Sequence, residues 1–435
     1  MVKKFTTKMF VYHVLGRSRT KLSILISTVT VAAVIFMIYG TDSINYEISA
    51  QPLGPLPFGD REIPERTDNG RLRSSIIHVQ LRSIQEESDH DHDRDLEVDD
   101  ESWNLLVPPF NVREGERIAW LRQKLPKFEI FKSNNITRLF HGRVMEFFSR
   151  DCEVRFFMTW ISPAGSFGRR EFLAVESLFK AHPRGCLMIL SRSMDSKRGI
   201  RILKPLLDRG FKVNAVTPDL PFLFKSTPAK AWFNEMKRGK KDPGEIPLAQ
   251  NLSNLLRLAV LYKYGGVYMD TDFILLKPLS ELRNSIGAQS MDMETKRWTR
   301  LNNAILVFDM NHPLLLRFME EFATTFDGNK WGHNGPYMVS RVVERVGKKP
   351  AFGFAVLPPM AFYPVDWNKI GRLFKKPKNR ADSKWVNAKL LQLSGETYGI
   401  HLWNRQTSRL IIEEGSVMGR LISDHCVICQ QIYSS

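Results

Sequence analysis

The chain has 435 residues, of which 43% are hydrophobic and 11% aromatic, so it can bury a large core, and a wholly disordered protein is excluded. Its formal net charge of +17 would suit nucleic acid, but the basic residues are spread along the chain instead of clustering among aromatic residues. We therefore expect no nucleic-acid binding.

An apolar segment without charged residues runs from Leu22 to Tyr39. In a helix that rises about 1.5 Å per residue it would span roughly 27 Å, close to the thickness of the hydrocarbon core of a membrane. Basic residues precede the segment and acidic residues follow it, so the positive-inside rule predicts a cytoplasmic tail (1–21), a transmembrane signal anchor (22–39) and a lumenal remainder. A cleaved signal peptide is the alternative, which the long basic tail disfavours.

Residues 40–150 are rich in proline, glycine, serine and charge, which is typical of a stem. We interpret the acidic run at 86–101 as a solvated spacer. Short apolar stretches near Leu105 and Glu114 suggest elements that dock onto a globular domain. The sequon at Asn135 would accept an N-glycan in a lumenal chain.

From residue 151 onward, short apolar runs alternate with amphipathic stretches, which predicts an α/β domain with a mainly parallel sheet. The expected strands are Val154–Trp160, Cys186–Leu190 and Lys212–Val216, and the expected helices are Arg170–His182 and Ile202–Leu207. Ligands of such sheets bind beyond the carboxyl ends of the strands, so Thr159 and Trp160 are candidate nucleotide contacts. For Trp160, ordinary core packing is an equally supported alternative.

Two aspartates follow a predicted helix and strand. The helix spans Leu248–Tyr264 and ends at Gly265, and the strand Val267–Asp270 starts at once. Side-chain alternation then puts Asp270 and Asp272 on the same side of the extended backbone, where two carboxylates repel unless a cation lies between them. Mn²⁺ or Mg²⁺ suits such oxygen ligands and also binds phosphate oxygens, so we predict a divalent metal that holds a nucleotide diphosphate.

The segment Asn251–Leu279, NLSNLLRLAVLYKYGGVYMDTDFILLKPL, resembles the DXD-containing α-1,4-glycosyltransferases of glycosyltransferase family 32. The resemblance continues through Asn302–Phe322, Trp331–Val346 and His401–Asn404. It implies a GT-A-type fold with a mixed, mainly parallel sheet for residues 151–435, in a type II Golgi membrane protein. It further implies retaining transfer of a hexose or N-acetylhexosamine, most simply from a UDP-sugar, to a glycan or glycolipid acceptor.

The resemblance also implies a set of site residues. Catalytic roles fall to Asp270, Asp272 and Arg257, and metal ligation to Asp272, Asp270, His401 and Asn404. Donor contacts fall to Thr159, Trp160, Asn254, Arg257, Tyr268, Asp270, Asn302, Asn303 and Trp403. A buried structural histidine is the alternative for His401.

The family often has Ser-Asp ahead of the helix arginine, whereas this chain has Ser253-Asn254 before Arg257, as plant-type members do. Asn254 and Arg257 share one helix face, so both could reach the same donor hydroxyls, and the amide would bind them without charge.

No dedicated nucleophile stands out, which favours catalysis by positioning and electrostatic stabilisation. The rival hypothesis is a non-catalytic Golgi protein that binds a partner glycosyltransferase, and the intact Asp270 and Asp272 pair argues against it. A glycosidase needs two carboxylates on opposite sides of a sugar, which an adjacent DxD pair does not supply.

The chain has four cysteines, Cys152, Cys186, Cys426 and Cys429. They are too few for a disulfide scaffold and lack the spacing of a structural zinc site. Cys152 and Cys186 flank the first strand-helix unit and could bridge, and Cys426 and Cys429 could form a local pair, although other pairings stay open.

Overall fold

A computed structural model describes residues 106–347, 349–430 and 432–433. The expected cytoplasmic tail, the membrane anchor and the part of the stem before residue 106 lie outside these residues. Within the described ranges, no helix is both long enough and apolar enough to cross a membrane.

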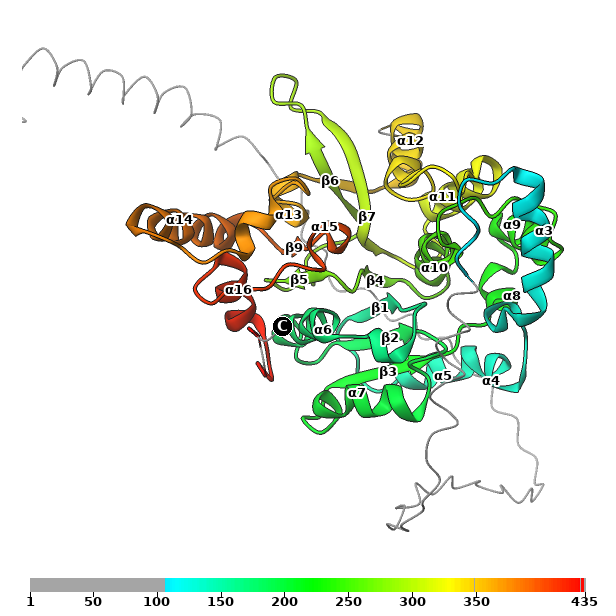
Figure 1. The fold of residues 1–435 in the computed structure, drawn as a ribbon, viewed down its shortest axis with the longest axis horizontal. Helices are drawn as coiled ribbons and strands as arrows, with labels where there is room; N and C mark the ends of the chain where they lie inside the picture. Colours follow the sequence, from blue (N-terminus) through cyan, green and yellow to red (C-terminus); the bar gives the residue numbers. More distant parts are fainter. Residues whose placement is uncertain (1–105, 348, 431, 434–435) are drawn as a thin grey trace, which may run out of the picture. The chain divides into compact units, whose positions relative to one another are not determined.

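The centre of the fold is a seven-stranded sheet in the order β3-β2-β1-β4-β7-β6-β8 (Figure 1). Its strands are β1 (Arg155–Thr159), β2 (Cys186–Leu190), β3 (Lys212–Val216), β4 (Gly266–Met269), β6 (Ser285–Met291), β7 (Trp298–Phe308) and β8 (Ala355–Leu357). Only β7 runs antiparallel to its neighbours in this sheet. The predicted α/β fold with a mixed, mainly parallel sheet is confirmed by this pairing, and the central strands β1 and β2 are the mostly apolar, buried runs that a sheet covered on both faces requires.

Helices cover both faces of this sheet. They include α6 (Arg169–Ala181), α7 (Lys197–Leu207), α8 (Leu220–Phe224), α9 (Ala229–Lys237), α10 (Leu248–Tyr264), α11 (Pro313–Thr325) and α12 (Pro336–Val346). Alternate residues of β1 enter different hydrophobic clusters: Phe157 packs in the cluster that contains α10 side chains, and Phe156 and Met158 pack in the cluster that contains those of α6.

Helices of the segment ahead of residue 150 pack against the same core. They are α3 (Glu114–Lys124), α4 (Asn135–Arg138) and α5 (Phe140–Phe148). Leu121 and Phe140 are fully buried in the cluster that contains α10, and Arg117 of α3 forms a 2.7 Å ion pair with Asp242. The packed structure therefore includes residues that composition alone assigns to the stem, in line with the docking elements expected near Glu114.

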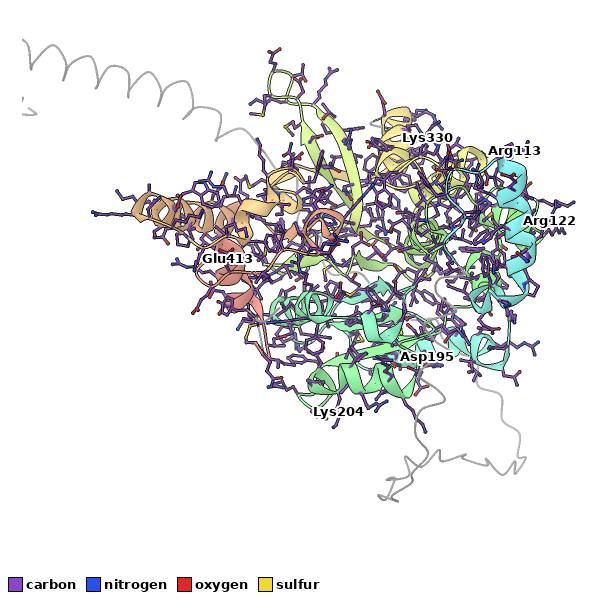
Figure 2. All side chains as sticks on the ribbon, viewed as in Figure 1. Arg113, Arg122, Asp195, Lys204, Lys330 and Glu413 are labelled. Atoms are coloured by element: carbon purple, nitrogen blue, oxygen red, sulfur yellow. A yellow bond between two sulfur atoms is a disulfide. The ribbon has the colours of Figure 1, made fainter. Side chains whose placement is uncertain are left out.

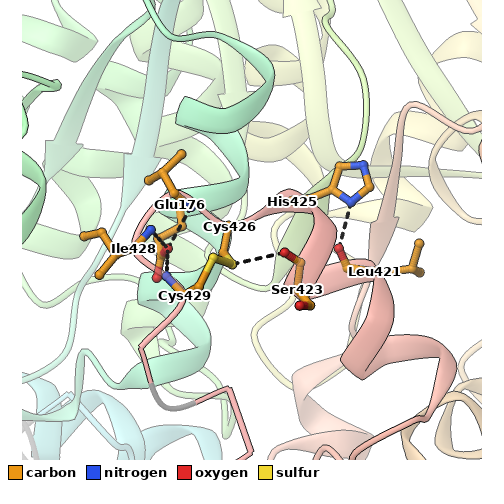
Figure 3. The surroundings of a disulfide bond; sticks show 8 residues. Glu176, Leu421, Ser423, His425, Cys426, Ile428 and Cys429 are labelled. Atoms are coloured by element: carbon orange, nitrogen blue, oxygen red, sulfur yellow. Dashed lines mark hydrogen bonds between the residues drawn. A yellow bond between two sulfur atoms is a disulfide. The ribbon is translucent and has the colours of Figure 1, made fainter.

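The C-terminal part adds α13 (Pro359–Phe362), α14 (Arg380–Glu396), α15 (Asn404–Thr407) and α16 (Val417–His425). After α16, the backbone N–H groups of Val427, Ile428 and Cys429 all donate to one carboxylate oxygen of Glu176, at 2.9, 2.6 and 2.9 Å (Figure 3). Glu176 lies on α6 and is 1% exposed. This carboxylate therefore fastens the C-terminal segment to the helix that begins beside the candidate site.

Both expected disulfides are present, Cys152–Cys186 and Cys426–Cys429. The first joins residues 34 positions apart, so the chain-entropy model gives it about 3 to 4 kcal/mol of stabilisation. We expect the Cys152→Ala/Cys186→Ala double variant to lose about that much in denaturant unfolding. The matched Cys426→Ala/Cys429→Ala variant should lose less, because its bridge spans only three positions. Equal losses in the two variants would contradict this loop-length argument.

Asp195, labelled in Figure 2, connects α5 to the end of β3 through hydrogen bonds. Its carboxylate accepts two hydrogen bonds from Arg143, at 2.8 and 2.7 Å, and two from the backbone N–H and hydroxyl of Thr217. Burial alone would raise the pKa of Asp195, but the bonds from Arg143 and Thr217 outweigh it and hold the pKa below the ordinary value of 3.8.

A carboxylate with a lowered pKa stabilises the fold above its ordinary pKa and loses that effect as the pH falls through the folded value. We therefore expect Asp195→Asn to destabilise the protein by about 2 kcal/mol at pH 7, with a difference that shrinks below about pH 4. Urea unfolding of both proteins between pH 7 and pH 3 measures this, and a difference that does not change with pH would contradict it.

Candidate functional site

A sharp backbone turn between α10 and β4 determines the position of the DxD segment. Gly265 and Gly266 follow α10 with φ of +62° and +111°. A Cβ on Gly265 would lie 2.7 Å from the backbone nitrogen of Met310, so only glycine fits this close approach. The turn starts β4 directly after the helix, and Asp270 and Asp272 emerge at the carboxyl end of that strand, as the sequence predicts.

A second, two-stranded sheet brings the C-terminal part of the chain to this point. It pairs β5 (Phe273–Leu275) with β9 (Gly399–His401), and Phe273 lies opposite His401. As a result, the ligand atoms of Asp270, Asp272 and His401 all lie within 4.8 Å of one another. One carboxylate oxygen of Asp272 is 3.2 Å from His401 Nε2.

The backbone after β9 wraps around Asp272. The N–H of Leu402 donates to the Asp272 carbonyl at 2.8 Å, and the N–H of Asn404 donates to its carboxylate at 2.9 Å. Between them Trp403 has φ of +56°, a conformation that costs energy for a bulky residue and that functional sites retain. The Trp403 ring lies edge-on to the His401 ring, with 4.3 Å between their centroids.

Asp270 is held from the other side by Arg257 of α10. The guanidinium of Arg257 approaches the two carboxylate oxygens at 3.0 and 3.2 Å, and it also donates to the Asn303 carbonyl at 2.6 Å. The Tyr268 hydroxyl donates to Asp270 at 2.8 Å, and the Arg257 guanidinium lies over the Tyr268 ring at 4.5 Å. The Arg257 side chain is only 3% exposed, so its charge interacts with Asp270 and little with solvent.

The two aspartates have different electrostatic surroundings. Burial raises the pKa of Asp270, and the neighbouring Asp272 carboxylate raises it further, so that together they outweigh Arg257. Burial also acts to raise the pKa of Asp272, but His401 and the N–H of Asn404 outweigh it, and the pKa of Asp272 is lowered. Asp272 is thus the better-stabilised anion of the pair.

Hydroxyl and amide groups extend the network along α10. The Thr159 hydroxyl contacts the Ser253 hydroxyl and lies 2.8 Å from the Tyr268 hydroxyl. The Asn303 amide donates to the Asn254 side-chain oxygen at 3.0 Å. Hydrogen bonds therefore connect Thr159, Asn254 and Asn303 to the DxD segment, and their contact with the sugar donor stays a prediction.

Asn302 and Trp160, which were also expected to bind the sugar donor, form hydrogen bonds with residues outside this network. The Asn302 amide donates to Gln289 of β6 at 3.0 Å, and its oxygen accepts from the backbone of Ala304. Trp160 donates to the carbonyl of Pro163 and packs edge-on against Phe167, which matches the core alternative for this residue. A contact between either side chain and the sugar donor stays a prediction.

Sequence reasoning missed Glu171. One of its carboxylate oxygens accepts from the Gly168 N–H at the start of α6, and the other lies 3.4 Å from the Asn404 amide nitrogen. Burial raises the pKa of Glu171, with a smaller contribution from Asp272. From sequence, a glutamate in the first turn of a helix indicates only a cap, so nothing marked it as part of the site.

The residues present fit a divalent cation. The Asn404 side-chain oxygen is buried and has no hydrogen-bond partner among the described residues, while its amide nitrogen faces Glu171. A buried oxygen without a partner is costly, and a hard cation would satisfy it. Two carboxylates and one imidazole complete a ligand set suited to Mn²⁺ or Mg²⁺.

The site combines paired aspartates at the end of a strand, a buried arginine and several amides. Family models of glycosyltransferases match the same part of the chain. Residues 168–292 match the family model described as the glycosyltransferase sugar-binding region containing the DXD motif, a region that implies divalent-metal binding. Residues 307–433 match the α-1,4-glycosyltransferase conserved region.

Three relatives show which proteins the chain is similar to. The lactosylceramide 4-α-galactosyltransferase of Mus musculus is 33% identical over 265 residues, which cover 58% of this chain and 68% of that protein. An uncharacterized protein of Arabidopsis thaliana is 30% identical, over 66% of this chain and 44% of that protein. The human α-1,4-N-acetylglucosaminyltransferase is 28% identical, over 48% and 58%. The chain belongs to the DXD-containing α-1,4-glycosyltransferase family and is a glycosyltransferase, as the sequence resemblance implies.

Proposed function

We propose that this glycosyltransferase has a GT-A-type fold and transfers a hexose or N-acetylhexosamine from a UDP-sugar, with retention of configuration, to a glycan or glycolipid acceptor. The observation that carries the proposal is the meeting of Asp270, Asp272 and His401 beside the buried Arg257. A mixed sheet with one antiparallel strand, and a small second sheet that holds the motif, support the fold type.

Asp272, Asp270, His401 and Asn404 would hold the cation, with Mn²⁺ as the first candidate and Mg²⁺ as the second. When bound, the cation neutralises the diphosphate and stabilises its departure. Arg257 opposes the rise in the pKa of Asp270 that burial causes, and Glu171 faces the amide nitrogen of Asn404 so that the amide oxygen is left for the cation.

The sugar would lie against the amides of Asn254 and Asn303, which accept and donate hydrogen bonds to hydroxyls without adding charge. Trp403 would form a wall of the donor pocket. The acceptor hydroxyl forms its bond to the anomeric carbon on the face that the diphosphate leaves, and its proton passes to a diphosphate oxygen. No protein nucleophile is needed, so positioning and electrostatic stabilisation supply the catalysis.

We also propose a single-pass type II Golgi location with a lumenal catalytic domain. The apolar segment 22–39 and its flanking charges support it, as do two disulfides, which persist in oxidising compartments. Asn135 is exposed at the start of α4 and could carry a glycan. Protease digestion of sealed microsomes should leave the large domain intact until detergent is added, and its digestion without detergent would refute this topology.

The proposed activity is tested by a donor screen with the full-length protein in detergent. UDP-galactose, UDP-glucose and their N-acetyl derivatives are supplied with Mn²⁺, and both UDP release and transfer to a lactose-terminated acceptor are measured, because a relative is named for lactosylceramide. We expect one donor to be preferred and EDTA to abolish turnover. A protein that neither hydrolyses nor transfers from any UDP-sugar would contradict the proposal.

A further inference from the structure

One loop touches both sides of the candidate site. It spans residues 327–335, between α11 and α12. At its end, the Asn334 amide donates to Asn251 of α10 at 2.9 Å. Gly335 approaches the same helix so closely that a Cβ there would lie 2.9 Å from the Asn254 side-chain oxygen. This end of the loop is therefore seated beside the amides assigned to the donor sugar.

The earlier part of the loop contacts α15, which begins at the proposed metal ligand Asn404. The Arg405 guanidinium lies over the Trp331 ring, with 3.9 Å from its central carbon to the ring centroid. Arg405 follows Asn404 on α15, and the N–H of Asn404 donates to Asp272. The loop thus extends from the donor amides at Asn254 to the helix that begins at the metal ligands.

Two aromatic rings, Trp331 in this loop and Tyr337 in the first turn of α12, remain open to solvent. Trp331 is 49% exposed and Tyr337 is 40% exposed. Each has a guanidinium over its ring, from Arg405 in the first case and from Arg300 of β7 in the second, at 4.6 Å. Single exposed apolar residues are ordinary, but here each exposed aromatic ring is paired with an arginine from another element, so that apolar ring faces and guanidinium donors lie together.

We propose that Trp331, held by Arg405, is the platform that binds the terminal sugar of the acceptor. A pyranose presents an apolar C–H face that fits an aromatic ring, and its hydroxyls fit the donors of a guanidinium. The donor sugar is assigned to the buried amides of Asn254 and Asn303, whereas the acceptor arrives from solvent, where Trp331 is exposed. The ligand class is a neutral, hexose-terminated glycan, and the inference rests on the proposed function.

The test separates acceptor binding from donor chemistry in the full-length protein. UDP release without acceptor is measured for the preferred donor, and the acceptor KM is measured with methyl β-lactoside. We expect Trp331→Ala to raise the acceptor KM by about tenfold or more, with donor KM and UDP release within about twofold of the wild type. Trp331→Phe should recover most of the acceptor affinity, and a retained melting temperature shows that the variants fold.

Phe110→Ala is the matched control, because it removes an aromatic side chain that is 80% exposed and lies outside the site residues. It should leave both KM values unchanged. The platform is refuted if Trp331→Ala has a normal acceptor KM, or if the wild type hydrolyses the donor and yet shows no binding of methyl β-lactoside by saturation-transfer NMR. Absence of UDP release from every donor in the wild type would instead refute the proposed function.

Discussion

Replacement of Asp272 by asparagine is expected to lower metal-dependent turnover by about a hundredfold or more without unfolding the protein. The side chain keeps its size, and its remaining oxygen can still accept the N–H of Asn404, but the charge that faces His401 and would bind the proposed cation is lost. Asp270→Asn should be nearly as damaging. The measurements are kcat/KM for the preferred UDP-sugar at saturating Mn²⁺, together with the melting temperature.

Asp309→Asn is the control for general loss of negative charge. Asp309 directly follows β7, at the opposite end of β4 from the DxD segment, because Phe308 pairs with Gly266. It forms an ion pair with Arg283 in which both side chains are about half exposed, so its loss should cost less than about 1 kcal/mol and leave turnover nearly unchanged. If both motif variants kept near-normal turnover in the folded state, the metal site and the mechanism built on it would have to be abandoned.

Sequence patterns predicted the parts of the fold that depend on local chemistry. The helix predicted at Leu248–Tyr264 and the strands at Cys186–Leu190 and Lys212–Val216 have the predicted bounds. Continuous apolar runs mark buried strands, and a glycine pair marks the turn that presents the aspartates. The position of β7 between β4 and β6 could not be predicted in this way, because the pairing of distant strands leaves no local pattern.

The helices before residue 150 show that composition alone does not reveal which parts of the expected stem pack against the globular domain. Charged and proline-rich surroundings favoured a stem, although α3 and α5 bury side chains such as Leu121 and Phe140. Their packing depends on the cluster that α10 provides. Tertiary burial therefore determined the outcome there, since short helices gain most of their stability from packing.

The residues of the candidate site also differ in whether local sequence patterns could predict them. Asp270 and Asp272 could be found from one helix, one turn and one strand, whereas the role of Arg257 came from the family resemblance. His401 and Asn404 came only from a family resemblance, because their approach depends on the pairing of β5 with β9 across a long stretch of chain. Asn302 was assigned to the donor from its motif, but the register of β6 and β7 directs its amide to a neighbouring strand.

The second large effect is expected at Arg257, whose side chain joins α10 to the DxD segment. Arg257→Met removes the partner of Asp270 and the donor to the Asn303 carbonyl, which should cost about 3 kcal/mol in the free energy of unfolding and nearly all turnover. Arg257→Lys keeps the charge, but one ammonium cannot replace a planar guanidinium that contacts both carboxylate oxygens and a carbonyl. It should still lose about tenfold or more in kcat/KM.

A double variant tests whether the two side chains act as a pair. Arg257→Met combined with Asp270→Asn removes both charges, so the stability lost in Arg257→Met should be largely recovered while turnover stays low. Urea unfolding and kcat/KM of the two single variants and the double variant complete the cycle. If the stability losses simply added, Arg257 and Asp270 would not be coupled, and the role of Arg257 as the charge partner of the Asp270 carboxylate would be wrong.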